Sequence, residues 1–363
     1  MKILIISNCY PNKNRPDSCI FIKNLYDALN KNQLDVNCVF LSLTGKESKL
    51  KKILKYIKYH FSAFYNILTN KYDIIHINYV SHNILITIFA KIVSKAKIIN
   101  NYHGSDLYEV KQKWFYQFIN KISDMIILPS FTFKNRVEEK AGKLTNSYIF
   151  PSSGIDQNIF KYNYNQLVQN ILNDTIEIAY VSSVNREKGI YEAIEAVNDV
   201  NTTTTKGTKV KLHIIGNGPD LHYIKNYRSK YINIIGPVQQ KSIPNYLKTC
   251  SLFLFPSKRT KTESLGLVPL EAMSMGLPVI ASDIPITKEY VTDDYNGFIF
   301  KKGDSKELSD KIIKYINLSV ENKITMSKRA YNISKKYERK LVIGKLIKEY
   351  SKLIENNKRK NGL

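Results

Sequence analysis

The stretch "ESLGLVPLEAMSMGLPVIAS", Glu263 to Ser282, predicts a loop, a short helix and a buried strand in quick succession. Pro269 suits the first turn of a helix, because its missing N–H group would have no partner there. The letters "GLP" are a helix stop, and the apolar run that follows is typical of a strand in a parallel sheet. Glu263 therefore belongs to a loop that faces a helix start, and Glu271 lies about one turn inside the helix.

A helix start offers free N–H groups and the positive end of the helix dipole, and both attract phosphate. A carboxylate beside such a start would instead accept hydrogen bonds from hydroxyl groups. The alternative is that Glu263 and Glu271 are ordinary acidic residues near a helix N-terminus, interacting with its dipole. Motifs elsewhere in the chain have to distinguish a ligand-binding role of the two glutamates from a purely structural one.

Strand-like runs alternate with amphipathic stretches over most of the 363 residues. One series runs from "KILIIS" to "SYIFPSS", and a second runs from "IEIAYVSS" to "GFIF". This alternation is the pattern of doubly wound α/β domains, and two series predict two such domains in tandem. We place the first domain at residues 1–162 and the second at 163–341, with a C-terminal helix at 342–363 that joins the first domain.

The composition, 43% hydrophobic and 24% charged, is that of a soluble globular protein. No stretch reaches eighteen apolar residues without a charge, so no transmembrane helix is expected, and the apolar start reads as a first strand. Cys9, Cys19, Cys38 and Cys250 show no CxxC spacing, which predicts neither a zinc site nor a disulfide framework. A reducing cytoplasm is the default expectation.

The chain carries 55 Lys and Arg against 31 Asp and Glu, a formal charge of +24, which suggests an anionic partner. Lys, Asn, Ile and Tyr are all abundant, as an AT-rich genome would produce, so the position of the charge is more informative than its sum. From Lys49 to Leu68, apolar residues recur at helical spacing beside five lysines. This segment predicts either a helix on an anionic membrane surface or an ordinary helix packed on the sheet.

Ligands of open α/β sheets bind beyond the carboxyl ends of the strands. "VSSVNREKGI" follows a strand there and carries Arg186 and Lys188, which would clamp a diphosphate or be turn residues in solvent. "YHGSD" ends a strand of the first domain, where His103 would donate a hydrogen bond or a proton, or would be structural beside a capping Asp106. Histidines and carboxylates show no metal-ligand spacing, so no metal site is predicted.

In order, Lys188-Gly189, "GNGP", "IIGPV", "FPS", Glu263-x7-Glu271 and "NGFIF" resemble the group 1 glycosyltransferases of the GT-B fold. The resemblance covers the whole second domain, and "YP", "FIKNL", "YHGSD" and "PSSGID" extend it through the first. It implies two Rossmann-like domains that face each other across a cleft, with a nucleotide-sugar donor held mainly by the second and the acceptor on the side of the first.

The resemblance also implies roles for individual residues. Glu271 would bind the ribose hydroxyls, Glu263 the transferred sugar, and Lys188 the leaving diphosphate, with His103 reaching the donor from the first domain. The implied catalytic residues are His103, Lys188 and Glu263. The implied donor-binding residues are Ser183, Arg186, Lys188, Gly216, Val238, Glu263, Leu265, Gly266, Leu267 and Glu271. The implied acceptor-side loop contains Ser18, Cys19 and Asp106.

Two departures from the family pattern concern these loops. Ser182, Ser183 and Val184 stand where the family usually has Gly-Arg-Leu, so a second phosphate cation is missing unless Arg186 replaces it. Cys19 stands where the family usually has glycine.

The resemblance implies a retaining, metal-independent hexosyltransferase without a cofactor, with UDP as the expected donor nucleotide. The expected acceptor is a lipid-linked glycan of a surface polysaccharide such as O-antigen or capsule. The expected location is cytoplasmic, peripheral at the inner face of the membrane, through Lys49–Leu68. One alternative is a sugar-nucleotide epimerase or a phosphorylase of the same fold. A further alternative, a non-enzymatic basic binding protein, lacks base-reading motifs, and no nucleic-acid partner is predicted.

Overall fold

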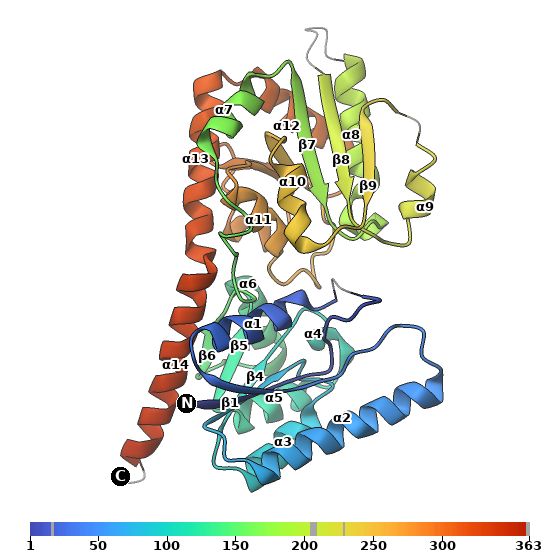
Figure 1. The fold of residues 1–363 in the computed structure, drawn as a ribbon. Coiled ribbons are helices and arrows are strands. Elements are labelled where there is room, and N and C mark those ends of the chain that lie inside the picture. Colours follow the sequence, from blue (N-terminus) through green and yellow to red (C-terminus); the bar gives the residue numbers. More distant parts are fainter. Residues whose placement is uncertain (16–17, 204–208, 228, 361–363) are drawn as a thin grey trace. The chain divides into compact units, whose positions relative to one another are not determined.

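The computed structural model describes residues 1–15, 18–203, 209–227 and 229–360. Contacts divide the chain into two compact units (Figure 1). Unit 1 contains Met1–Gly154 together with the chain from Lys340 onward, and unit 2 contains Ile155–Arg339. From the sequence we placed the corresponding boundaries after residues 162 and 341.

Unit 1 is built on a parallel sheet of six strands in the order β2-β1-β3-β4-β5-β6. The strands are β1 (Lys2–Ser7), β2 (Asp35–Phe40), β3 (Ile74–Asn78), β4 (Lys97–Asn101), β5 (Met125–Leu128) and β6 (Ser147–Ile149). The central strands β3 and β4 are buried on both faces, because helices cover both sides of the parallel sheet, and their buried polar residues are His76, Asn78, Asn100 and Asn101. This arrangement is the doubly wound domain that the first series of apolar runs predicts.

Two layers of helices cover the sheet of unit 1. One face packs against α1 (Ile20–Lys31) and α14 (Arg339–Lys360), with Leu346 and Tyr350 of α14 fully buried. The other face packs against α2 (Lys49–Thr69), α3 (Ile84–Val93), α5 (Lys113–Ile122) and α6 (Phe131–Ala141). The single turn α4 (Asp106–Glu109) follows β4. The C-terminal helix thus completes the core of unit 1.

Unit 2 repeats the plan with a parallel sheet in the order β12-β11-β10-β7-β8-β9. The strands are β7 (Thr175–Val181), β8 (Lys209–Ile215), β9 (Ile232–Gly236), β10 (Leu252–Phe255), β11 (Val279–Ser282) and β12 (Gly297–Phe300). The longer helices are α7 (Tyr164–Leu172), α8 (Ile190–Thr203), α11 (Leu267–Ser274), α12 (Ser305–Asn317) and α13 (Val320–Ser334). The shorter ones are η1 (Arg186–Lys188), α9 (Leu221–Ile224), η2 (Gln240–Ser242), α10 (Ile243–Leu247), η3 (Thr287–Glu289) and η4 (Lys335–Tyr337).

The sheet of unit 2 is also covered on both faces. α10, α11 and α13 contribute to the core on one face, and α8 and α12 to the core on the other. The loops after β7, β8, β9 and β10 leave the sheet at the carboxyl ends of adjacent parallel strands. Ligands of such sheets bind at this edge. The predicted fold class, two Rossmann-like domains of α/β type, is confirmed.

Candidate functional site

The N-terminus of α11 lies at the carboxyl edge of the unit 2 sheet, one loop after β10. Gly266 precedes the helix with a φ of 76°, in the left-handed region that favours glycine. A Cβ atom at this position would lie 3.1 Å from the Tyr290 hydroxyl and 3.2 Å from the Phe255 ring. Glycine therefore allows the loop to pack closely against Tyr290 and Phe255. The first N–H groups of α11 lack intrahelical partners.

Lys188 and Glu263 meet at this edge, although 75 residues separate them in the chain. Lys188 ends η1, whose start is capped by the Asn185 side chain accepting from the Lys188 N–H at 3.0 Å. The Lys188 ammonium contacts a Glu263 carboxylate oxygen at 2.6 Å, and the Ser257 hydroxyl donates to the same oxygen at 3.0 Å. Only 13% of the Lys188 side chain and 10% of the Glu263 side chain are exposed. The sequence assigned these two groups to different parts of a donor, and here they form an ion pair.

Glu271 is buried in α11, one turn after the helix start. Its carboxyl group accepts a hydrogen bond of 2.6 Å from the side-chain amide of Gln240. Burial raises the pKa of Glu271 to about 7, although the Gln240 hydrogen bond and the charge of Arg339 lower it. The carboxyl group therefore titrates near neutral pH, which is typical of groups in ligand sites.

The other predicted donor residues lie in the loops after β7, β8 and β9 or at the start of α11. Gly216, at the end of β8, has a φ of 141°, and a Cβ there would lie 1.9 Å from the Ser182 carbonyl oxygen. Ser183 is exposed and accepts from Asn185, whereas the Arg186 guanidinium lies over the Tyr191 ring at 5.2 Å. Val238, Leu265 and Leu267 pack against or within the hydrophobic core beside α11. The structure thus stacks Arg186 on an aromatic ring, and its role as a second phosphate cation stays a prediction.

Unit 1 presents a second group of polar residues, at the carboxyl ends of β3 and β4. His103 is buried between the rings of Phe21 and Tyr79, with ring centroids at 4.8 and 4.5 Å. Its Nε2 lies 3.2 Å from the Asn78 amide oxygen, so Nε2 carries the proton in the neutral imidazole. Burial, with His76 adding to it, lowers the pKa of His103 to about 3. His103 is therefore neutral at physiological pH, with its Nε2–H donating to Asn78 and its Nδ1 able to accept a hydrogen bond.

Asp106 supports the loop that carries His103. One carboxylate oxygen accepts from the His103 N–H at 2.8 Å, and the other accepts from the Ser81 hydroxyl at 2.8 Å. Burial raises the pKa of Asp106 to about 7, against these hydrogen bonds. The α4 helix has no side-chain cap, so Asp106 braces the loop and does not cap the helix as one reading of the sequence proposed.

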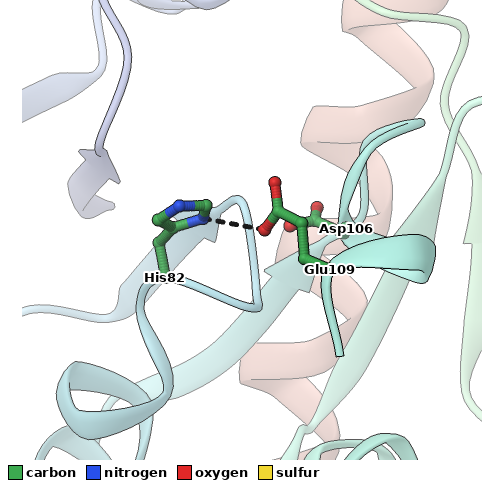
Figure 2. Close-up of side chains that lie close together, drawn as sticks. All are labelled: His82, Asp106 and Glu109. Atoms are coloured by element: carbon green, nitrogen blue, oxygen red, sulfur yellow. Dashed lines mark ion pairs between the residues drawn. The ribbon is translucent and has the colours of Figure 1, made fainter. Parts of the chain in front are cut away.

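His82, Asp106 and Glu109 lie together in the same place, with their ligand atoms within 4.8 Å of one another (Figure 2). The His82 Nδ1 atom lies 3.0 Å from a Glu109 oxygen. The sequence interpretation missed this group, because only the i, i+3 spacing of Asp106 and Glu109 hints at it. Such a group can hold a metal ion, yet hydrogen bonds to His103 and Ser81 already engage both Asp106 oxygens. The expected absence of a metal stays a prediction.

Replacing Asp106 with asparagine is expected to change how stability depends on pH. The Asp106 pKa is raised from 3.8 to about 7, so its contribution to stability is full below about pH 4 and is lost as pH rises through 7. The asparagine variant cannot titrate there. Its deficit in melting temperature relative to the wild type should therefore be largest at about pH 5 and several degrees smaller at about pH 8. If calorimetric scans show the same difference in melting temperature between variant and wild type at both pH values, the raised pKa does not belong to Asp106.

The loop between β1 and α1 corrects the expectation from the cysteines. Cys9 and Cys19 form a disulfide, with Cα atoms 6.0 Å apart. A spacing of ten residues gives no signal in sequence, but the loop folds back and brings the two Cβ atoms together. Cys19 has a φ of 51°, the left-handed conformation that the family's glycine adopts easily, and its neighbour Ser18 contacts the Cys9 sulfur at 3.4 Å. The prediction that the cysteines form no disulfide is therefore wrong for this pair.

Four residues of these two groups were not singled out from sequence. Gln240 fixes the Glu271 carboxyl group, Ser257 donates to Glu263, and Asn78 faces the His103 ring. Tyr290 buries a hydroxyl beside Gly266 that has no hydrogen-bond partner among the described residues. The "FPS" motif contained Ser257, but the other three lie outside any recognisable motif.

Comparison with protein-family models identifies the class. Residues 165–336 match the model described as "Glycosyl transferases group 1", and residues 17–127 match the model described as "Glycosyl transferase 4-like". The first match spans both carboxylates of α11 and its loop as well as Lys188. The chain belongs to the group 1 glycosyltransferases of the GT-B fold.

Known proteins agree with this class. The chain is 27% identical over 281 residues to an uncharacterized glycosyltransferase of Methanocaldococcus jannaschii, covering 75% of this chain and 73% of that one. It is 24% identical over 371 residues to the O-antigen biosynthesis glycosyltransferase WclY of Escherichia coli, covering 93% and 94%. The Anabaena protein HepE in complex with UDP and glucose has the same fold, with a TM-score of 0.73, 16% identity, and coverage of 97% and 100%.

Proposed function

We propose that the chain is a retaining, metal-independent glycosyltransferase that moves a hexose-type sugar from UDP to a lipid-linked glycan of a surface polysaccharide. The observation that carries this proposal is the Lys188–Glu263 ion pair at the start of α11, with the buried Glu271 one turn behind it. An O-antigen glycosyltransferase among the relatives supports the pathway class, and the UDP complex of HepE supports the nucleotide.

In this proposal the donor lies along the N-terminus of α11. Glu271 accepts hydrogen bonds from the ribose hydroxyls, and Glu263 accepts hydrogen bonds from hydroxyls of the transferred sugar. The first N–H groups of α11 face the diphosphate. Donor binding would draw Lys188 from Glu263 toward the diphosphate, so the ion pair is the resting state of the site.

Transfer then breaks the bond between the anomeric carbon and the leaving phosphate oxygen. The acceptor hydroxyl oxygen bonds to the same face of that carbon, and its proton passes to the leaving phosphate oxygen, which retains the anomeric configuration. Lys188 stabilises the negative charge that develops on the diphosphate, which is the largest electrostatic contribution expected here. A fixed ammonium can fill this role without a metal ion. The contact of His103 with the donor stays a prediction.

The acceptor side of the proposal is a lipid-linked glycan at the inner face of the cytoplasmic membrane. The chain has basic, apolar surface on α2 that suits such a place. Among the described residues, no helix combines the length and the apolar character needed to cross a membrane. The chain would therefore meet a membrane-held acceptor from the surface of the bilayer.

Incubation with UDP-hexoses and GDP-mannose tests the proposal, with lipid-linked glycan extract as acceptor and EDTA present throughout. We expect UDP release that depends on the extract, and a product whose anomeric proton coupling in NMR matches that of the donor. Inversion of the anomeric configuration, or activity only when Mg²⁺ replaces EDTA, would contradict the retaining, metal-independent mechanism.

A further inference from the structure

The face of α2 that points away from the sheet is apolar, although the helix also packs on the sheet through a narrower face, as one reading of the sequence expected. Of the 21 residues of this helix, only Tyr59, Ala63 and Ile67 are buried. Except for the half-buried Phe64, the apolar residues that the sequence placed at helical spacing are exposed. Those exposed on this face are Leu50, Ile53, Leu54, Ile57, Phe61, Tyr65 and Leu68. Leu50 and Phe61 are each 68% exposed, so this stripe, here called the α2 stripe, does not hold the helix to unit 1.

The neighbouring helix α3 extends the apolar surface. α2 and α3 lie side by side (Figure 1), and the rings of Phe64 and Phe89 meet between them at 4.5 Å. Leu85 at the start of α3 is 61% exposed, and Ile92, two turns farther along the same side, is 77% exposed. Monomeric soluble proteins rarely expose contiguous apolar area of this kind unless it binds something.

A hollow opens in this surface between the two helices. It has a volume of about 380 Å³, and its walls are formed chiefly by Ile53, Ile57, Phe61 and Phe64 of α2 with Leu85 of α3. Lys52 and His60 lie at its border. An open, apolar hollow of this kind is filled more favourably by hydrocarbon than by water.

The charges around the α2 stripe select the partner. α2 contains five lysines and no acidic residue, and α3 contains one lysine and no acidic residue. Lys55 pairs with Glu47, whereas Lys51 and Lys58 are exposed. Lys51 and Lys58 each lie one helical turn from Leu54, so they border the stripe on one side. A second copy of this chain docking by the same face would bring lysines toward lysines. An anionic surface with an apolar interior suits both the exposed lysines and the apolar side chains of the stripe.

We propose that the α2 stripe docks on a bilayer that contains anionic phospholipids, with α2 lying in the plane of the interface. Leu54, Ile57 and Phe61 enter the acyl region, and Lys51 and Lys58 meet the lipid phosphates. The inference gives the proposed transferase a membrane partner and rests on that function only in placing the lipid-linked acceptor in the same bilayer.

Co-sedimentation with vesicles tests the inference without any donor sugar, so its outcome is independent of transfer activity. The vesicles are phosphatidylcholine alone, and an equal mixture of phosphatidylcholine and phosphatidylglycerol. We expect binding to the mixed vesicles that weakens with salt. The double variant Leu54→Ser/Phe61→Ser should lower the affinity for the mixed vesicles by roughly tenfold or more for each residue replaced. The double variant Lys51→Gln/Lys58→Gln should lower it by about fivefold for each residue replaced.

The matched control removes equally exposed apolar side chains from unit 2. Leu172 is 60% exposed and Tyr223 is 62% exposed, so Leu172→Ser/Tyr223→Ser changes surface hydrophobicity without touching α2. This control should bind as the wild type does, and unchanged melting temperatures should show that all variants fold. Equal binding by the control and the α2 variants would overturn the inference. Self-association through the α2 stripe, seen by sedimentation velocity without vesicle binding, would overturn it as well.

Discussion

Lys188→Ala is expected to lower kcat for sugar transfer by about 10²- to 10³-fold, with a much smaller change in donor binding. In the proposed site, Lys188 is the cation that faces the diphosphate. A fixed cation stabilises the negative charge that develops on the leaving group in the transition state more than it stabilises the bound donor. The residual activity would come from the N–H groups at the start of α11. Steady-state kinetics with the donor that supports UDP release would measure both parameters.

The chain offers a matched control for this variant in Lys258. Its ammonium contacts the Glu192 carboxylate at 2.6 Å, the same distance as in the Lys188–Glu263 pair, and it is similarly buried. Lys258→Ala removes an ion pair of the same unit outside the proposed donor contacts. If Lys188→Ala and Lys258→Ala lower kcat equally, the loss reflects a lost ion pair, and the electrostatic role of Lys188 is wrong.

Glu271→Ala is expected to raise the Kd for UDP by about 10- to 100-fold, the usual effect of losing hydrogen bonds to a charged group. The pKa of Glu271, raised to about 7 by burial, adds a pH signature. In the proposed site the ionised carboxylate would accept hydrogen bonds from both ribose hydroxyls, so the affinity of the wild type for UDP should fall as pH drops through about 7. Isothermal titration at about pH 6 and pH 8 would measure this difference.

Glu271→Gln serves as the control for charge in that experiment. The amide keeps the shape of the side chain and one acceptor oxygen beside Gln240, but it does not titrate. Its affinity for UDP should be intermediate and independent of pH. A variant that shows the same pH dependence as the wild type would assign the titration to another group and remove Glu271 from the ribose site.

The donor-side architecture could be predicted from local sequence because each of its parts is a local signal. The helix that begins at Leu267 follows from a left-handed glycine, an early proline and a glycine stop, all within a dozen residues. The ion pair between Lys188 and Glu263 could not be predicted, because it depends on the order of strands β7 and β10 in the sheet. The resemblance supplied both residues but assigned them to separate ligand groups.

The orientation of α2 illustrates a different limit. Its apolar stripe is regular, yet the buried residues of the face that packs on the sheet are only Tyr59, Ala63 and Ile67. Periodicity reports that a helix is amphipathic, but it cannot tell which of two apolar faces meets the core. The Cys9–Cys19 disulfide and the His82, Asp106 and Glu109 group depend similarly on how loops fold together.

Thermal melting with UDP, GDP, ADP, CDP and dTDP, each with magnesium and with EDTA, tests the central claim most directly. A ligand held only by the folded state stabilises it by about 2.7 kcal/mol at a hundred times its Kd, so a bound nucleotide raises the melting temperature. We expect a rise with UDP that EDTA does not diminish and that Glu271→Ala greatly reduces. A rise that requires magnesium, a rise that survives Glu271→Ala, or no rise with UDP would contradict it.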